Sequence, residues 1–579
     1  MHGGCRALID FMETFIGPLY NAIIIMGEFS VLIGGQAGDG IKQAGNAIAR
    51  AFNRLGYWIF VYEDYPSLIR GGHNFAIVRA SSKRIASHRE RVDVLVALNQ
   101  EAVDRHSWRL GNGSMTIFDS GLVKAEGLGI PMGEMVRRRG LPSILRNTIA
   151  LGALAAVLGI GLDVVEDVVR ATMGKRVEEN LEVAREGYGI ASGSPRGAQG
   201  PKAERVPGGP RPLLTGNEAL ALGLARGGMR IYAAYPMTPT SALLHYIAAH
   251  EDELGAIAIH PESEIAVIGI AQGAAYAGIR SAVGTSGGGF SLMVEHLSLA
   301  GQAEIPTVIV LGQRLDPATG APTYTKQGNL FFAMFAGHGE FPRAVLAPGD
   351  ADEAFHLAAE AMNLAWRFQI PVIILSDKHL SESTFSSSFE ASRAGEEPPK
   401  LWDGTGDYKR YAQTEDGVSP LAFPGGGAVV KANSYEHDEF GITTEDADLI
   451  AKAQEKRLRK AEALEEHLSG KETLRVHGDP DSRIALVVWG STKGVAVEVA
   501  ERIGASVIQP LYLLPLPKRE LEKRLEGAER VIGIEGNSTG QFCRWLRYHG
   551  LRVDEVLLKY DGRPFASDEL EGKLRGILG

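Results

Sequence analysis

Apolar runs of strand length alternate with amphipathic segments of helical length in three stretches of the chain, residues 29–191, 213–380 and 482–579. A segment rich in Gly, Pro and Ser, residues 192–212, has the composition of a linker, and a polar, irregular connecting region covers residues 381–481. Strand–helix alternation favours parallel sheets covered by helices. The pattern therefore predicts an α/β protein with three parallel-sheet domains.

Local signals define several elements within these stretches. Thr215 and Glu218 have the spacing of a capping box and predict a helix up to Leu224. In the last stretch, apolar runs predict strands near residues 484–489, 507–512 and 531–535. These elements fit strand–helix units in the second and third stretches.

Residues 1–28 precede the first clear strand and are expected to form an N-terminal extension. They contain an apolar run, residues 16–26, that is too short to span a membrane and has Glu13 close by. No small-residue cleavage site follows a basic region, so a secretory signal is not indicated. We therefore expect a cytoplasmic protein without membrane attachment.

The formal net charge is −10, and basic and acidic residues are interleaved without a basic stripe. Nucleic acid is therefore not expected as a partner. A charged helix is predicted at about residues 447–468, and its charges are interpreted as a solvated face. Cys5 and Cys543 are the only cysteines, too few to hold an iron–sulfur cluster within this chain. Any such cluster must be carried by a partner.

The first stretch begins with an apolar strand, a glycine-rich turn and a helix. Such a turn either serves only as a tight connection or presents backbone N–H groups to the phosphates of a nucleotide or CoA. The residues that would form this phosphate site are Gly35, Gln36, Gly38, Asp39, Gly40 and Lys42. Residues 38–40 also open the magnesium motif of thiamine-diphosphate enzymes, but Asn53 comes too soon and Asn74 too late to complete it. No metal site is therefore predicted here.

In the second stretch, three predicted strands end in loops rich in polar residues or glycine, within residues 231–241, 284–293 and 310–320. The carboxyl ends of parallel strands share one edge of a sheet, so these loops are expected to be neighbours. Thr238, between two prolines, is either a plain turn residue or a hydrogen-bonding group for a small carboxylate or carbonyl. Arg314 either forms a salt bridge to a neighbouring domain or binds a carboxylate.

Residues 260–278 form an apolar segment rich in small residues, which predicts a buried helix with Glu264 in its first turn. An acid at this position either interacts favourably with the positive end of the helix dipole or is the partly desolvated carboxylate that protonates N1′ of the thiamine aminopyrimidine. The spacing alone leaves both interpretations open.

Several long motifs occur in order along the chain. Those of the second and third stretches resemble the alpha subunit of 2-oxoacid:ferredoxin oxidoreductases: Tyr-Pro-Met-Thr-Pro-Thr at 235–240, Thr-Ser-Gly-Gly-Gly-Phe-Ser-Leu-Met at 285–293, Gln-Arg at 313–314, Gly-His-Gly-Glu-Phe-Pro-Arg at 337–343 and Trp-Gly-Ser-Thr-Lys-Gly at 489–494. Those of the first stretch are similar to the gamma subunit of the same family: Gly-Gly-Gln-Ala-Gly-Asp-Gly-Ile-Lys at 34–42 and Arg-Asn-Thr-Ile-Ala-Leu-Gly-Ala-Leu at 146–154. The chain thus resembles a fused gamma–alpha subunit.

The resemblance implies a Rossmann-like gamma domain, a thiamine pyrimidine-binding domain and a transketolase C-terminal-like domain. It also implies CoA-dependent oxidative decarboxylation of 2-oxoacids (pyruvate, 2-oxobutyrate, 2-oxoglutarate) to acyl-CoA and CO2, with electrons passing to ferredoxin. The family's magnesium–pyrophosphate half-site and iron–sulfur cluster belong to a beta subunit. This subunit is therefore the expected partner, and thiamine diphosphate is shared with it.

The resemblance also assigns roles to individual residues. Glu264 would activate the thiamine aminopyrimidine, and Thr238 and Arg314 would hold the carboxylate and carbonyl of the 2-oxoacid. Thiamine diphosphate would further contact Pro236, Thr285 and Gly287. The glycine-rich turn at residues 35–42 would cradle the phosphates of CoA.

The sequence departs mildly from the family pattern at Met237, Thr240, Gly288 and residues 315–320. Asp316 places a negative charge two residues from Arg314, so the substrate range stays open. Three alternatives are a transketolase-like enzyme complete in one chain, a non-catalytic CoA-binding or scaffold subunit, and an arylpyruvate ferredoxin oxidoreductase. The missing magnesium motif argues against the first.

Overall fold

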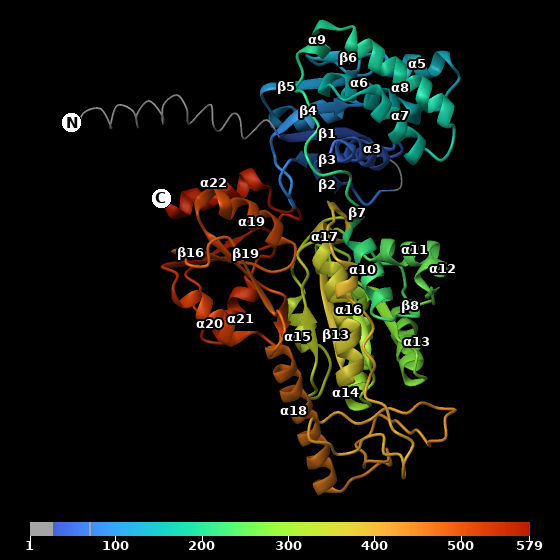
Figure 1. Cartoon of the computed structure of the whole chain (residues 1–579), viewed down its shortest axis with the longest axis vertical. Helices are drawn as coiled ribbons and strands as arrows, with labels where there is room; N and C mark the ends of the chain where they lie inside the picture. The colour runs from blue at the N-terminus through green and yellow to red at the C-terminus, as the bar shows by residue number, and fades with distance from the viewer. Residues whose placement is uncertain (1–26, 69–70) are drawn as a thin grey trace, which may run out of the picture. The chain divides into compact units, whose positions relative to one another are not determined.

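The computed structural model describes residues 27–68 and 71–579, so the predicted N-terminal extension lies almost entirely outside the described residues. The chain divides into two compact units, residues 1–212 and 213–579. Each unit is an α/β structure (Figure 1). Within the described part of the chain, no helix is long and apolar enough to cross a membrane.

The first unit contains one mixed sheet with strand order β6-β5-β4-β1-β3-β2. The strands are β1 (Glu28–Gln36), β2 (Trp58–Asp64), β3 (His73–Ser81), β4 (Val92–Ala97), β5 (Leu110–Asp119) and β6 (Leu128–Ile130). The helices are α3 (Ile41–Arg54), α4 (Gln100–His106), α5 (Met132–Arg138), α6 (Arg146–Leu158), α7 (Leu162–Thr172), α8 (Val177–Ser192) and α9 (Pro195–Ala198).

This sheet differs from the expected parallel arrangement at one side. β1 pairs with β4 in parallel, but β3 runs antiparallel to both β1 and β2. The connection between β2 and β3 spans only residues 65–72 and contains no helix among its described residues, which suits an antiparallel pair rather than a parallel crossover. The α/β class is confirmed, and the first sheet is mixed.

The second unit contains a seven-stranded sheet with order β18-β12-β13-β11-β10-β8-β9, in which all neighbours are parallel except β18 and β12. Its strands are β8 (Ile231–Ala233), β9 (Ile257–Ile259), β10 (Ser281–Thr285), β11 (Thr307–Gln313), β12 (Ala344–Leu346), β13 (Pro371–Asp377) and β18 (Tyr512–Leu514). The accompanying helices are α10 (Gly216–Arg226), α11 (Ser241–Ala249), α12 (Glu251–Leu254), α13 (Glu264–Tyr276), α14 (Gly287–Gln302), α15 (Leu330–Phe335), α16 (Ala351–Phe368) and α17 (Lys378–Glu382). The short strands β7 (Leu213–Thr215) and β14 (Thr384–Ser386) pair with each other.

The predicted capping box is confirmed at the start of α10. The Glu218 amide donates to the Thr215 hydroxyl at 3.2 Å, and the Thr215 amide donates to the Glu218 carboxylate at 2.7 Å. These two bonds satisfy N–H groups that a helix start otherwise leaves unpaired.

A five-stranded sheet, in the order β15-β17-β16-β19-β20, completes the second unit. Its elements are β15 (Leu474–His477), β16 (Ile484–Val487), α19 (Thr492–Ile503), β17 (Ser506–Pro510), α20 (Lys518–Glu526), β19 (Arg530–Glu535), α21 (Gln541–Tyr548), β20 (Glu555–Leu558) and α22 (Ser567–Leu578). The three strands predicted here are present. Directly after β17 the chain forms β18 at the edge of the seven-stranded sheet, and one apolar core extends from Ile309 to Trp489 and Phe542. The two sheets of this unit are therefore packed together.

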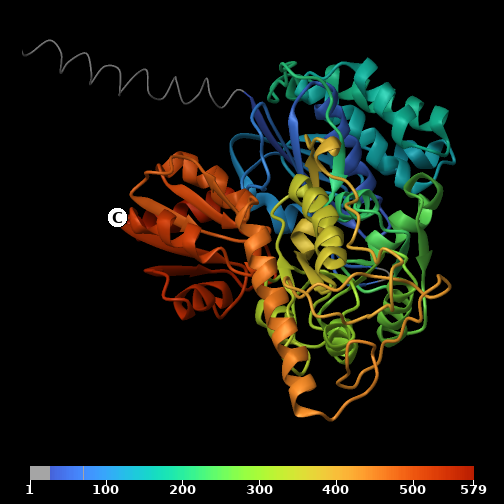
Figure 2. The same ribbon diagram turned by 60° about the horizontal axis from the view of Figure 1, so that its bottom comes forward.

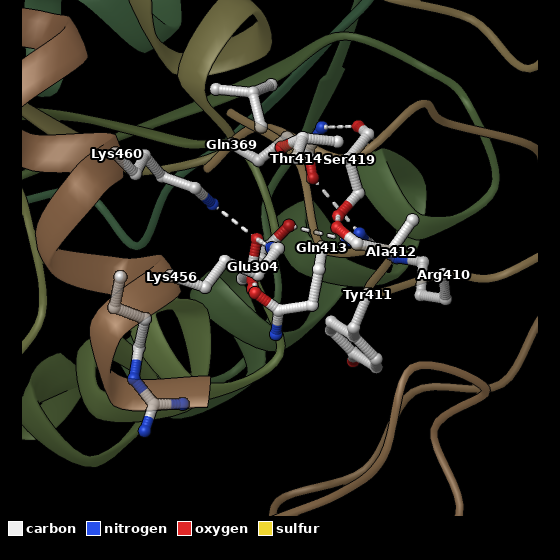
Figure 3. A network of polar contacts seen from close by, with 12 residues as sticks. Glu304, Gln369, Arg410, Tyr411, Ala412, Gln413, Thr414, Ser419, Lys456 and Lys460 are labelled. Carbon is white, nitrogen blue, oxygen red and sulfur yellow. Dashed lines mark hydrogen bonds and ion pairs between the residues drawn. The ribbon is translucent and has the colours of Figure 1, made fainter. Parts of the chain in front are cut away.

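The predicted charged helix is α18 (Ala447–Ser469), which leads from the irregular region to the five-stranded sheet (Figure 2). Its interpretation as a solvated face is wrong on one side. Lys456 and Lys460 are each 1% exposed and both bind the carboxylate of Glu304, the first at 2.7 Å. Arg410 donates to the backbone carbonyl of Glu304 at 2.6 Å (Figure 3). Glu304, a buried acid two residues after the last residue of α14, thus pairs with cations that a solvated face would expose.

Candidate active site

The three loops expected to be neighbours open at the carboxyl edge of the seven-stranded sheet. β8, β10 and β11 are adjacent and parallel, so their ends bring residues 234–240, 286–291 and 314–320 to one edge. The Arg314 guanidinium donates to the backbone carbonyl of Thr238 at 2.9 Å. The loops after β8 and β11 are therefore joined directly.

Arg314 is only 8% exposed, and burial lowers the pKa of its guanidinium while the nearby Asp316 charge opposes this shift. No carboxylate among the described residues forms an ion pair with Arg314 within 4.0 Å. The interpretation of Arg314 as a salt-bridge partner therefore finds no support in the described part of the chain. A buried guanidinium lacking a carboxylate is suited to bind one from a ligand.

Glu264 begins α13 and is 4% exposed. The helix is capped by the Ser263 hydroxyl, which accepts from the Ala266 amide at 3.4 Å, so the Glu264 carboxylate is not needed for capping. Its Oε1 atom is buried without a hydrogen-bond partner among the described residues. An unpartnered buried carboxylate oxygen is costly and indicates a place for a ligand donor.

Glycine makes room for this carboxylate at the start of α14. A Cβ atom at Gly289 would lie 2.6 Å from Oε1 of Glu264 and 2.1 Å from the hydroxyl oxygen of Thr285, so no larger residue fits without displacing them. Glu264 and Thr285, predicted from separate segments, therefore both lie against the same glycine.

An open pocket lies beside Arg314. The start of α14, the loop after β11 and the start of α15 form its wall, with Ser286, Gly287, Gly288, Ser291, Arg314, Asp316, Pro317, Ala318, Asn329 and Phe332. Asp316 does not ion-pair with Arg314; its carboxylate is bound by Lys326 Nζ and Asn329 Nδ2, each at 2.7 Å. Asp316, whose charge two residues from Arg314 left the substrate range open, is thus paired with other residues and not with Arg314.

Sequence reasoning missed Ser286, Lys326 and Asn329. Ser286 Oγ and Asn329 Oδ1 are buried without partners among the described residues, and both residues line the pocket. Asn329 is placed by its backbone amide, which donates to the side chain of Gln313 at 3.0 Å. Ser286 is the second residue of the recognised motif at 285–293, but no role was assigned to it. Nothing in the spacing from Asp316 to Lys326 and Asn329 indicates that these residues meet.

Two of the noted departures, Gly288 and Met237, lie close together. A Cβ atom at Gly288 would lie 4.0 Å from the sulfur of Met237. Thr240 is 1% exposed, and its hydroxyl donates to the Met237 carbonyl at 2.9 Å instead of capping α11. Thr240 therefore packs within the loop after β8, and Met237 packs against the start of α14 at Gly288.

In the first unit, the glycine-rich turn links β1 to α3. Gln36 and Gly38 are exposed, and Gly38 has a positive φ of 99° that suits glycine. Lys42 is 65% exposed and lies 3.2 Å from Glu63. The turn therefore presents Gln36, Gly38 and Lys42 at the surface of this unit.

Asp39 of the same turn points inward. Its carboxylate accepts from the Gln36 amide at 3.0 Å and binds Arg146 at 2.7 Å. Asn147 Nδ2 donates to the backbone carbonyl of Asp39 at 3.3 Å. The two gamma-type motifs thus meet, and Asp39 holds the turn in shape.

Two family models match the chain. "Pyruvate ferredoxin/flavodoxin oxidoreductase" matches residues 30–190, and "Pyruvate flavodoxin/ferredoxin oxidoreductase, thiamine diP-bdg" matches residues 223–456. The fold and the site, together with these matches, define the class of ferredoxin- or flavodoxin-dependent oxidoreductases.

Relatives of similar length refine this assignment. The chain is 34% identical to 2-oxoacid:ferredoxin oxidoreductase 2, subunit alpha, of Aeropyrum pernix, over 96% of this chain and 98% of the relative. It is 32% identical to the corresponding alpha subunit of Sulfolobus sp, over 95% of this chain and 97% of the relative. The chain belongs to the 2-oxoacid:ferredoxin oxidoreductase family and is of the alpha-subunit type, as its motifs predicted.

A solved structure supports the same family. The chain is 30% identical to the 2-oxoglutarate:ferredoxin oxidoreductase from Magnetococcus marinus, described with 2-oxoglutarate, coenzyme A and succinyl-CoA bound. The match covers 96% of this chain and 100% of that chain, with a TM-score of 0.87. The α/β class inferred from the sequence is therefore confirmed by a known structure.

Proposed function

We propose that this chain is the catalytic subunit of an enzyme that oxidatively decarboxylates 2-oxoacids to acyl-CoA and CO2 and passes the electrons to ferredoxin. Family membership supports the reaction class. The observation that carries the catalytic role is the buried Oε1 atom of Glu264, which lacks a partner among the described residues and lies beside Gly289. A scaffold subunit would have no need to keep such an atom.

The residues around Glu264 fit the aminopyrimidine of thiamine diphosphate. The carboxylate is desolvated and unpartnered on one oxygen, and glycines at the start of α14 allow a flat ring to approach. Glu264 would hold a proton at N1′ of the aminopyrimidine, with Pro236, Thr285 and Gly287 as further contacts. When bound, thiamine diphosphate supplies the carbon nucleophile and the electron sink of the decarboxylation.

Arg314 and Thr238 are proposed to hold the 2-oxoacid. The buried guanidinium would bind the substrate carboxylate, and its bond to the Thr238 carbonyl fixes its direction. The Thr238 hydroxyl would contact the carbonyl of the substrate. In the first unit, Gly35, Gln36, Gly38, Gly40 and Lys42 would bind the phosphates of CoA, with Asp39 shaping the turn.

The partner is proposed to be a beta subunit that carries an iron–sulfur cluster, Mg²⁺ and the pyrophosphate site. The chain's two cysteines support this division, because a cluster needs more thiolates than this chain has. We place the complex in the cytoplasm, with ferredoxin as the electron acceptor. The domain borders predicted above, at residues 29–191, 213–380 and 482–579, are part of this proposal.

The test is CoA-dependent reduction of a viologen dye by the chain co-expressed with its beta subunit. We expect Glu264→Gln to lower kcat by roughly 10²-fold or more, because an amide cannot exchange the proton at N1′. Glu262→Gln, the same change at an exposed position two residues away, is the matched control and should stay within about twofold of the wild type. Full activity of Glu264→Gln, or turnover without any beta subunit, would overturn the proposal.

A further inference from the structure

The pocket beside Arg314 contains one cation and one anion. Among its lining residues only Arg314 and Asp316 are charged, and the others are glycines, polar residues or the apolar Pro317, Ala318 and Phe332. Arg314 provides one binding position for a carboxylate. If Arg314 binds one carboxylate of a ligand, no other lining residue of this pocket is a cation that could bind a second carboxylate.

Asp316 is fixed in the wall of this pocket. Its two carboxylate oxygens are bound separately, Oδ1 by Lys326 and Oδ2 by Asn329, each at 2.7 Å, and Lys326 also donates to the Asp316 carbonyl at 3.2 Å. The two bonds to the carboxylate oppose rotation of the Asp316 side chain, and the third ties Lys326 to the backbone of the same residue. Lys326 is not one of the lining residues, so the carboxylate lines the pocket and its cation does not.

A second carboxylate in this pocket would be disfavoured in two ways. It would lose water without gaining a cation from the lining residues, and it would approach the negative charge of Asp316. Like charges within a partly desolvated site repel more strongly than in water. A 2-oxoacid with a short uncharged side chain has neither of these costs, and its side chain can contact the apolar Pro317, Ala318 and Phe332.

We propose that Asp316, held by Lys326 and Asn329, makes the site selective for 2-oxoacids with one carboxylate and a short uncharged side chain, against those with a second carboxylate. The inference rests on the proposed function, since it assumes that the 2-oxoacid carboxylate binds Arg314. It sets this chain apart in substrate range from the similar solved structure, whose described ligand 2-oxoglutarate has two carboxylates.

The test compares kcat/KM for 2-oxobutyrate and 2-oxoglutarate, using the complete enzyme with its beta subunit. We expect the wild type to favour 2-oxobutyrate by at least tenfold, and Asp316→Asn to lower that ratio by about tenfold or more. Asp316→Ser is a second variant in case the amide disturbs folding, and the unfolding temperature of both variants is checked first.

Lys326→Met is the matched control, because it breaks the same ion pair but keeps the Asp316 carboxylate. If charge selects the substrate, this variant keeps or increases the preference for 2-oxobutyrate; if only loop order matters, it lowers the preference as Asp316→Asn does. A wild-type preference for 2-oxoglutarate, an unchanged ratio in both Asp316 variants, or equal losses in Asp316→Asn and Lys326→Met would overturn the inference while leaving the proposed function intact. No turnover with any 2-oxoacid would instead contradict the proposed function.

Discussion

Glu304→Gln should destabilise the second unit more than an ordinary charge removal. The carboxylate lies among three buried cations, Lys456, Lys460 and Arg410, whose exposed fractions are 4% or less. Among the described residues, Lys456 and Lys460 form ion pairs with Glu304 and with no other acid. The amide would keep the shape of the side chain but leave these cations without a neighbouring negative charge.

The magnitude follows from the cost of breaking a buried ion pair, about 3–5 kcal/mol. A unit the size of residues 213–579 has an unfolding entropy of about 0.8 kcal/mol/K, so its unfolding temperature should fall by about 4–6 °C. Thermal unfolding followed by circular dichroism measures this change. Glu529→Gln is the control: its partner Arg483 is 77% exposed and Glu529 is 57% exposed, so the loss should stay near 0–1 kcal/mol.

An unfolding temperature of Glu304→Gln within about 1 °C of the wild type would refute this reasoning. It would mean that the buried cations do not depend on the carboxylate. Adding Lys460→Met to Glu304→Gln should recover part of the loss, because it removes one of the unpaired charges.

Two further predictions concern single residues. Burial lowers the pKa of Lys460 to about 7, so the folded protein releases a proton that the unfolded chain keeps up to about pH 10. Stability should therefore rise with pH between about 7 and 10, and Lys460→Met should reduce that rise in unfolding temperature; an unchanged rise would contradict the assignment. Gly289→Ala should lower turnover at saturating thiamine diphosphate by about 10²-fold, because its Cβ displaces Glu264. Gly273→Ala is the control, because there is open space around its Cβ. Equal turnover rates in the two variants would contradict the catalytic role proposed for Glu264.

Much of the candidate site could be predicted from local sequence. A strand that ends in glycine or polar residues places those residues at the edge of a parallel sheet, so Thr238, Thr285 and Arg314 were expected together. The buried helix with Glu264 in its first turn was also predicted locally, while the catalytic role of Glu264 came from the resemblance to the family. The capping box at Thr215 and the strands of the last stretch were equally local signals, and the structure contains them.

The ion pairs of the interior could not be predicted in this way. Glu304 and Lys460 are separated by 156 residues, and only the packing of α18 brings them together. On the sequence alone, a helix rich in Lys, Arg and Glu has the composition of a solvated face. Burial of its lysines depends on Glu304, an acid in the segment that follows α14.

The sequence by itself determined the α/β class, the family and the loops that carry the candidate catalytic residues, because strand periodicity and motif order are local properties of the chain. Only the tertiary structure decided that Asp39 binds Arg146, that Asp316 is held by Lys326 and Asn329, and that the first sheet is mixed. These features depend on which distant segments meet, and a charge or a strand has no preferred partner until packing places one beside it.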